Sequence, residues 1–164
     1  MPEIIVIAHN IRSTHNVGAI FRSSEGFGVS RIVLSGYTPY PLLPDDTRLP
    51  HISRKLSDQI HKTALGAEQI VPFSYQESPD IASLQAAGYR IVGLEQDKRS
   101  VILPDYRVPK KIALLLGEEV HGITDDMRLR CDDLIEIPMV GQKESFNVSV
   151  ATGIALYALT LGQN

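Results

Sequence analysis

The sequence contains a single cysteine, Cys131, among its 164 residues. One cysteine cannot form a disulfide within the chain or supply a cysteine-rich zinc site, so a disulfide framework and a zinc finger are excluded. The first ten residues, MPEIIVIAHN, lack the basic start and the long apolar run of a secretory signal. We therefore expect a cytoplasmic protein without a structural metal.

Charged residues are missing from the stretch 145–164, which is long enough to cross a membrane. Asparagine, serine and threonine residues interrupt this stretch, and polar groups are costly in lipid. The spacing of four apolar residues in steps of four, three and four predicts one packed face of a helix. These residues are Val150, Ile154, Tyr157 and Leu161. We therefore expect no membrane partner.

The common nucleotide-binding motifs are also missing. There is no GxxxxGK[ST] sequence anywhere in the chain. Gly26 and Gly28 begin a GxG pair, but Arg31 stands where a third glycine belongs, and the pair follows a helical segment rather than a strand. The usual NAD and ATP enzymes are therefore disfavoured.

Short β-branched runs alternate with helical patterns along the chain. The predicted strands are 3–8, 31–34, 69–72, 89–94, 112–116 and 134–137. Helical spacing covers 17–24, 56–65 and 79–87. Several strands are too uniformly apolar to have a wet face, so the alternation predicts an α/β fold with a parallel sheet covered on both faces. The chain length suits one domain over 1–164, with no separate N-terminal RNA-binding domain.

The net charge is −3, but the charges are unevenly distributed. Residues 1–62 contain seven Lys/Arg against five Asp/Glu, whereas residues 112–164 contain three against eight. A basic face can therefore coexist with an acidic whole, the alternative being ordinary solvated charge. The candidate basic residues are Arg12, Arg22, Arg31, Arg48, Arg54, Lys55 and Lys62.

Four prolines make the segment 35–50 an irregular loop. Its Tyr37, Tyr40 and Arg48 are residue types that stack on bases or bind phosphate. The structural alternative is a surface crossover with aromatic rings packed beneath it.

Three polar segments stand out as candidate sites. The first, 9–22, is a loop that leads into a helix; we expect Asn16 to cap that helix and Arg22 to project from it as a phosphate clamp. Its structural alternative is a cap followed by an exposed arginine. The second, 112–122, is an apolar strand that runs into Gly117 and Gly122 with two glutamates between them.

Glycines in that second segment allow positive φ and close approach of the backbone to a ligand, while Glu118 or Glu119 can orient a polar partner. The alternative is a tight turn with solvated glutamates. In the third segment, 137–150, we expect Ser145 to cap the last helix. Asn147 is placed to bond to a neighbouring loop.

Together these segments resemble the three ordered motifs of the SpoU-type (TrmH-like) RNA 2′-O-ribose methyltransferases of the SPOUT superfamily. The first motif, N-x-G-x-x-x-R, matches residues 16–22, and the second, G-x-E-x-x-G, matches residues 117–122. The third, I-P-M followed by a loop and S-x-N-V-S-V-A, matches residues 137–139 and 145–151. Glu118 and Val120 depart from the residues that are common in relatives.

The resemblance implies a parallel sheet with a deep C-terminal trefoil knot, S-adenosylmethionine (AdoMet) as the cofactor, no metal, and a homodimer that completes the site. The implied cofactor-binding residues are Leu116, Gly117, Gly122, Ile137, Met139, Ser145, Phe146 and Asn147. The implied catalytic residues are Arg22, Asn16, Glu119, Ser145 and Asn147. Arg22 is the central one, either as a general base or, as the high pKa of arginine favours, as an electrostatic clamp.

The resemblance further implies an RNA substrate. We expect tRNA, because the chain is similar to small single-domain members, and an RNA surface that includes Arg12, Arg22, Arg54 and Lys55. Three alternatives remain at this point: an rRNA 2′-O-methyltransferase, a non-catalytic RNA-binding or assembly protein that keeps the fold, and a small-molecule enzyme on an α/β sheet.

Overall fold

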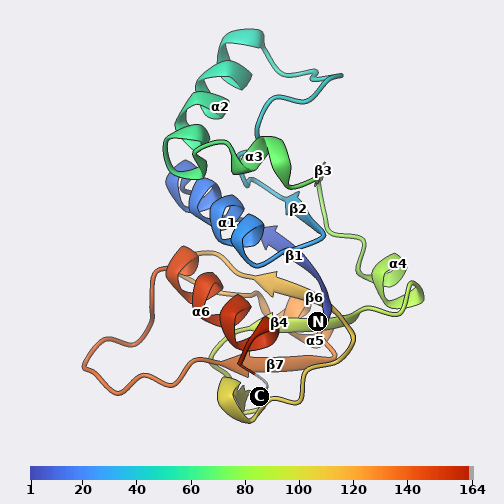
Figure 1. Cartoon of the computed structure of the whole chain (residues 1–164), viewed down its shortest axis with the longest axis vertical. Coiled ribbons are helices and arrows are strands. Elements are labelled where there is room, and N and C mark those ends of the chain that lie inside the picture. The colour runs from blue at the N-terminus through green and yellow to red at the C-terminus, as the bar shows by residue number, and fades with distance from the viewer. Residues whose placement is uncertain (163–164) are drawn as a thin grey trace.

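A computed structural model describes residues 1–162 as helices packed around one sheet of seven strands (Figure 1). The strands are β1 (Glu3–His9), β2 (Arg31–Ser35), β3 (Phe73–Gln76), β4 (Arg90–Leu94), β5 (Val101–Ile102), β6 (Lys111–Leu116) and β7 (Asp133–Glu136). Their spatial order is β3-β2-β1-β6-β4-β7-β5, and all neighbouring pairs are parallel. The carboxyl ends of the strands therefore meet at one edge of the sheet.

Helices cover both faces of the sheet, as the strand pattern predicts. They are α1 (Thr14–Gly26), α2 (Pro50–Ala64), α3 (Ala67–Ile70), α4 (Ile81–Ala86), α5 (Asp125–Leu129) and α6 (Val148–Thr160), with a 3-10 turn at Leu103–Asp105. Alternate residues of β1 point to opposite sides. Val6 packs in a core with Phe21 of α1 and Leu156 of α6, whereas Ile7 packs in a core with Leu84 of α4 and Met127 of α5.

The strand predicted at 69–72 is wrong. Residues 67–70 form the short helix α3, and the strand of this region, β3, begins after Pro72. A four-residue apolar run has no periodicity that separates strand from helix, and here Ile70 is exposed rather than buried. Pro72 has no N–H for a ladder, but its carbonyl accepts the hydrogen bond of Ile32 N–H that opens the β2–β3 pairing.

Two helices begin at residues other than those predicted, and two short elements were not predicted. α2 begins at Pro50, well before the predicted start at residue 56, because proline suits the first helical position. α4 begins at Ile81 after the capping residue Asp80, and not at Pro79. The sequence patterns missed β5 and α5, which are too short for a periodic signal.

The face of α6 that packs against the core is not the predicted one. The residues that pack inward are Thr152, Ala155, Leu156 and Leu159. The predicted face, Val150, Ile154, Tyr157 and Leu161, lies on the surface, with Val150 50% and Tyr157 57% exposed. The helix is apolar on nearly all sides, so spacing alone cannot decide which side is buried.

Residues 163–164, the end of the segment discussed above, lie outside the described residues. Within residues 1–162, no helix combines the length and the apolar character needed to cross a membrane.

Candidate functional site

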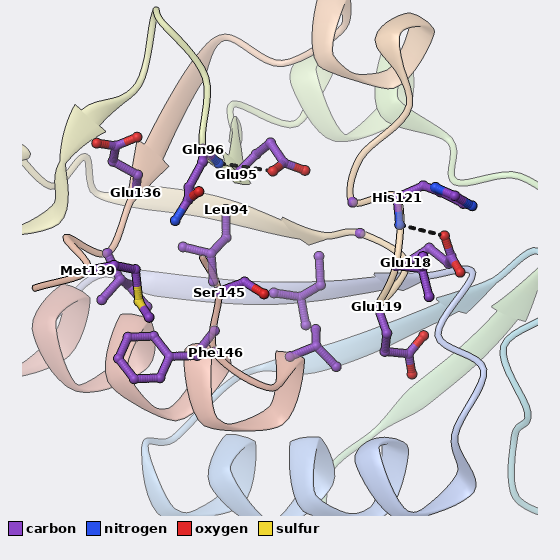
Figure 2. A pocket seen from close by; sticks show the side chains of 17 residues that line it. Leu94, Glu95, Gln96, Glu118, Glu119, His121, Glu136, Met139, Ser145 and Phe146 are labelled. Carbon is purple, nitrogen blue, oxygen red and sulfur yellow. Dashed lines mark hydrogen bonds between the residues drawn. The ribbon is translucent and has the colours of Figure 1, made fainter. Parts of the chain in front are cut away.

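A cavity of about 230 Å³ opens at the carboxyl ends of β4, β6 and β7 (Figure 2). Its walls are the residues that follow these strands, together with the start of α6. In open parallel sheets, ligands bind outside the carboxyl ends of the strands. This position makes the cavity the candidate cofactor site.

The cavity has an apolar end and an acidic end. Figure 2 shows Met139 and Phe146 at one side, Glu118 and Glu119 at the other, and Ser145 between them. Two further carboxylates, Glu95 and Glu136, and the amide of Gln96 also line the cavity. The apolar end suits an apolar ring of a ligand, and the acidic end suits a positive charge on it.

The loop after β6 is held in a tight turn by its two glycines. Glu118 N–H donates to the Gly122 carbonyl at 3.1 Å, and Gly122 N–H donates back to the Glu118 carbonyl at 2.8 Å. A Cβ on Gly117 would lie 2.3 Å from the Gly122 carbonyl carbon. A Cβ on Gly122, at φ 68°, would lie 2.1 Å from Glu95 Oε2. The space over Gly122 is therefore filled by the Glu95 carboxylate.

That carboxylate positions the loop. Glu95 Oε2 accepts from Ile123 N–H at 2.7 Å, and Glu95 Oε1 accepts from Gln96 N–H at 3.0 Å. Gln96 Nε2 in turn donates to the Glu144 carbonyl at 2.7 Å. The end of β4 thus fixes both loops of the cavity.

Glu118 is buried and paired. Its Oε1 accepts from Arg12 Nη2 at 3.1 Å, and its Oε2 accepts from His121 N–H at 2.9 Å. The structural alternative of a solvated glutamate is therefore wrong for Glu118. This pairing offsets the cost of burying a carboxylate at this position.

Glu119 joins the loop after β6 to the loop after β1. Its carboxylate accepts from the N–H groups of Arg12 at 3.1 Å and Ser13 at 3.2 Å, and from Asn16 Nδ2 at 3.0 Å. Burial acts to raise the pKa of Glu119, but these hydrogen bonds outweigh it and lower the pKa below its ordinary value. The residue is therefore a fixed anion at neutral pH.

A second hydrogen bond extends this network to α6. Asn147 Nδ2 donates to Asn16 Oδ1 at 3.1 Å, so Asn147, Asn16 and Glu119 form one chain of contacts. Asn147 therefore bonds across to another segment as predicted, but its partner lies in the first turn of α1 and not in a loop.

The two predicted helix caps are wrong. Ser13, not Asn16, caps α1, and its hydroxyl accepts from Asn16 N–H. Asn147, not Ser145, caps α6, and its Oδ1 accepts from Ser149 N–H at 2.9 Å. Each helix starts one turn or less away from the residue expected, since several capping residue types stand close together. Asn16 is thereby free to use its side chain between segments.

Arg22 does not join this network. It lies six residues beyond Asn16 on α1, which is about 9 Å along the axis and roughly 120° around it. It is exposed, and its guanidinium has no hydrogen bond or ion pair with any residue of 1–162. The structure therefore brings together Asn16, Glu119 and Asn147, with Ser145 at the cavity wall, but not the residue expected to be central.

Seven of the eight residues implied as cofactor-binding line the cavity. They are Leu116, Gly117, Gly122, Ile137, Met139, Ser145 and Phe146. Asn147 lies beside the cavity in the network described above. Four residues that line the cavity were not predicted from the sequence: Leu94, Glu95, Gln96 and Glu136. Their position directly after or at the end of predicted strands was the signal, because parallel strands deliver their last residues to one edge.

The expected RNA-binding arginines and lysine have different surroundings. Arg12 is 70% exposed beside the cavity, while Arg54 and Lys55 lie exposed on α2, away from it. Arg48, one of the candidate basic residues, is largely enclosed. It binds Asp46 and the carbonyls of Tyr40 and Pro41, so the structural alternative holds for it. Among residues 1–162, no cluster of three or more His, Cys, Asp or Glu residues has a geometry suited to a metal ion.

A parallel sheet with helices on both faces and a cavity at the carboxyl ends of its strands is typical of the α/β proteins that bind a ligand at this edge of the sheet. Within that class, the profile of the SpoU rRNA Methylase family matches residues 3–157. The chain belongs to this family. One similar protein is the 23S rRNA (guanosine-2′-O-)-methyltransferase RlmB from Coxiella burnetii. It is 33% identical to this chain over 158 residues, which cover 95% of this chain and 57% of the relative.

Solved structures agree in fold. The TrmH/SpoU tRNA modifying enzyme of A. aeolicus has 26% identity and a TM-score of 0.78, covering 98% of this chain and 75% of that one. An AdoMet-bound rRNA methyltransferase from Sinorhizobium meliloti has 24% identity and a TM-score of 0.80, covering 99% and 57%. The chain thus spans little more than half the length of the RlmB relative it matches.

Proposed function

We propose that this chain is an RNA methyltransferase that transfers the methyl group of AdoMet to a ribose 2′-hydroxyl. The observation that supports it most directly is the network of Asn147, Asn16 and Glu119 beside an acidic cavity at the strand ends. Membership of the SpoU family supplies the reaction class.

The cavity fits AdoMet chemically. AdoMet has an adenine ring, a sulfonium and an ammonium against one carboxylate, hence a net positive charge. The apolar side chains of Met139 and Phe146 suit the ring, and the surrounding glutamates suit the cation. The cavity is smaller than the roughly 300–1,000 Å³ of typical small-molecule sites. Because the loop 140–147 that borders it is exposed, we expect that loop to adjust when AdoMet binds.

When bound, AdoMet supplies an electrophilic methyl group. The chain then has to orient the ribose and stabilise the charge that develops on its oxygen. We assign orientation of the ribose to Asn16 and Asn147, whose amides are held on one side by Glu119 and on the other by the α6 cap. Ser145 contacts the cofactor or the acceptor from the cavity wall.

We assign electrostatic stabilisation to Arg22, supplied by a second copy of the chain. Within one chain Arg22 lies on a different side of α1 from Asn16 and has no contact with the network, which is why we assign it to the site of a second copy. The exposed apolar face of α6, beside α1 in Figure 1, is the surface we propose for the homodimer. A symmetric pair buries this face on both copies at once.

The threaded C-terminal knot also belongs to this proposal. Its support is the close agreement in fold with SpoU structures, at TM-scores near 0.8.

For the substrate we favour rRNA over the tRNA that the small size of the chain suggests. The Coxiella burnetii relative is named for 23S rRNA, whereas the structure named for tRNA is less similar in sequence. The comparisons therefore give the tRNA expectation no specific support. Both RNAs belong in the test.

The test is transfer of labelled methyl groups from AdoMet to unmodified rRNA and, separately, to tRNA, followed by nuclease digestion and nucleoside mass spectrometry. We expect a 2′-O-methylnucleoside in rRNA, and loss of at least about a hundredfold in rate for Arg22→Ala, since a charge-stabilising group contributes on this scale. Arg31→Ala is the matched control, because Arg31 is exposed at the opposite end of β2.

No methylation of either RNA despite AdoMet binding would overturn the proposed activity. Methylation of tRNA alone would overturn only the choice of rRNA. A methyl group on a base rather than on the ribose would overturn the assigned acceptor.

A further inference from the structure

A second hollow, a groove of about 670 Å³, lies next to the cofactor cavity. It runs between the residues Arg12–Thr14 and the loop 36–49 that connects β2 to α2. The two sites share a wall, because Arg12 and Ser13 line the groove while their N–H groups bind Glu119 of the cavity.

The side chains on the floor of the groove contact one another. The rings of Tyr40 and Tyr75 stack at 4.1 Å between centroids, and the Arg48 guanidinium carbon lies 3.6 Å from the centre of the Tyr40 ring. Two groups this close to one ring cannot share a face, so both faces of Tyr40 are covered. Tyr75 is fixed through its hydroxyl, which donates to the Gly36 carbonyl at 2.7 Å. Neither face of Tyr40 is therefore free to stack on a ligand, and Tyr75 has one face against Tyr40.

Tyr37 is the aromatic residue of the groove that remains open. Its side chain is 54% exposed and has no ring partner among residues 1–162. It also borders a separate cavity of about 140 Å³ behind the loop after β6, so there is open space on more than one side of it.

The backbone holds Tyr37 in place at some cost. Asn10 adopts a φ of 58° and Gly36 a φ of 65°, and the Asn10 Oδ1 accepts from Tyr37 N–H at 3.2 Å. A Cβ on Gly36 would lie 1.9 Å from that same Asn10 oxygen. Thr38 is buried and joins the two loops, donating to the Ala8 carbonyl and accepting from Ile11 N–H. Glycine adopts a positive φ without strain, whereas Asn10 is a non-glycine residue in the left-handed region, and residues held in that way are common at functional positions.

Positive charge lies on the same wall. Arg12 is 70% exposed, and Glu118 holds its guanidinium from behind at 3.1 Å. An arginine fixed on one side and open on the other is suited to a phosphate oxygen. An exposed ring beside such an arginine matches the way proteins bind single-stranded nucleic acid, with bases on aromatic faces and phosphates on cations.

Building on the proposed function, we propose that this groove binds the RNA nucleotide next to the one that is methylated, with its base stacked on Tyr37 and its phosphate at Arg12. The groove adjoins the active site through a single layer of residues, which suits an adjacent nucleotide. Stacking on an aromatic ring tolerates any base, so the site holds the strand in place and leaves base choice to other contacts.

The chain contains no tryptophan, which allows a direct optical test. Tyr37→Trp introduces the only indole, and we expect single-stranded RNA homopolymers to quench its fluorescence with a midpoint equal to the Kd measured by anisotropy. An abasic ribose-phosphate strand of equal length should not quench it. Ile70→Trp is the control, because Ile70 is 66% exposed and precedes the amino end of β3, whereas Tyr37 follows the carboxyl end of the neighbouring parallel strand β2, so it should report no quenching.

Tyr37→Ala gives the energetic test. We expect its RNA Kd to rise between about 5- and 150-fold, the range found for loss of one base stack, with AdoMet affinity unchanged. Tyr37→Phe should keep the wild-type Kd within about twofold, because stacking needs the ring and not the hydroxyl.

Three outcomes would each overturn this inference. They are equal quenching by the abasic strand, RNA binding to Tyr37→Trp without quenching, and an unchanged RNA Kd in Tyr37→Ala. Failure of the proposed function looks different: quenching by RNA persists, but the wild-type chain transfers no methyl group to any RNA.

Discussion

At the scale of single residues, Glu119 holds two loops together that are more than 100 positions apart in the sequence. Glu119→Gln keeps the size of the side chain but removes the charge. The N–H groups of Arg12 and Ser13 then lose their charged acceptor. We expect the methyl-transfer rate to fall roughly 10- to 100-fold, a loss of about 1.4–2.7 kcal/mol of transition-state stabilisation, with AdoMet affinity changed far less.

The pH dependence of stability tests whether the charge of Glu119 stabilises the fold. The lowered pKa of Glu119 means that its contribution to folding is fully present above the ordinary glutamate pKa and is lost as pH falls through the lower folded value. The difference in unfolding free energy between wild type and Glu119→Gln should therefore be constant near neutral pH and shrink under acid conditions. A difference that grows on acidification would contradict this account.

The sequence indicated the residues of this network but not the contacts between them. Asn16, Glu119 and Asn147 stand in motifs that singled them out, and the expected bond from Asn147 is present. The roles of Ser13 and Ser145 at the helix ends could not be decided, because serine, threonine and asparagine compete for each cap over three or four positions. Arg22 belongs to the first motif, yet the helical twist turns it away from the network.

At the scale of elements, the loop 117–122 depends on its glycines. Gly122→Ala combines a left-handed backbone with a Cβ that displaces the Glu95 carboxylate from Ile123 N–H. We expect a loss of about 2–5 kcal/mol in the free energy of unfolding, from backbone strain and the broken hydrogen bond together. Denaturant unfolding gives the stability, and calorimetric titration should show at least a tenfold weaker AdoMet affinity.

Gly28→Ala is the matched control. Gly28 has nearly the same φ, 67°, but a Cβ there meets no atom within 4 Å. Only the backbone strain of about 1–2 kcal/mol remains, and AdoMet affinity should not change. Equal effects of the two variants on AdoMet affinity would show that the Glu95 contact does not shape the site.

Element prediction succeeded where the chain is fully buried and failed where elements are short or exposed. β1, β2, β4, β6 and β7 were predicted within one or two residues, because their apolar runs lie inside the sheet. The run 69–72 looked similar, but only Val71 of its four residues is buried, and only its packing distinguishes it from a strand. The loop after β2 was recognised from its prolines, whereas the enclosure of Arg48 by Tyr40 and Asp46 required the fold.

At the scale of the whole molecule, the proposed dimer predicts complementation between two inactive variants. Arg22→Ala and Asn147→Ala chains are each expected to be nearly inactive. A mixed dimer contains one site with both residues intact, so randomly assorted chains should recover about a quarter of the wild-type rate. The measurement is methyl transfer after the two variants are co-refolded, compared with each variant alone.

The control removes the interface and leaves the site residues unchanged. Val150→Glu places a charge on the exposed face of α6 and should give a monomer by light scattering, with no recovery when it is built into both chains. Absence of recovery in verified mixed dimers would place Arg22 in the site of its own chain. Recovery in Val150→Glu chains that remain dimeric by light scattering would place the interface away from this face of α6.

By itself the sequence determined the α/β class, the two-sided burial of the sheet and the motifs that identify the family, because these depend on local periodicity and on residues close together in the chain. The tertiary structure decided which side of α6 is buried, which groups Glu118 and Glu119 bind, and that Tyr37 is open while Tyr40 and Arg48 are not. These outcomes depend on contacts between distant segments. Such contacts select among local alternatives that have nearly equal free energy in the isolated segment.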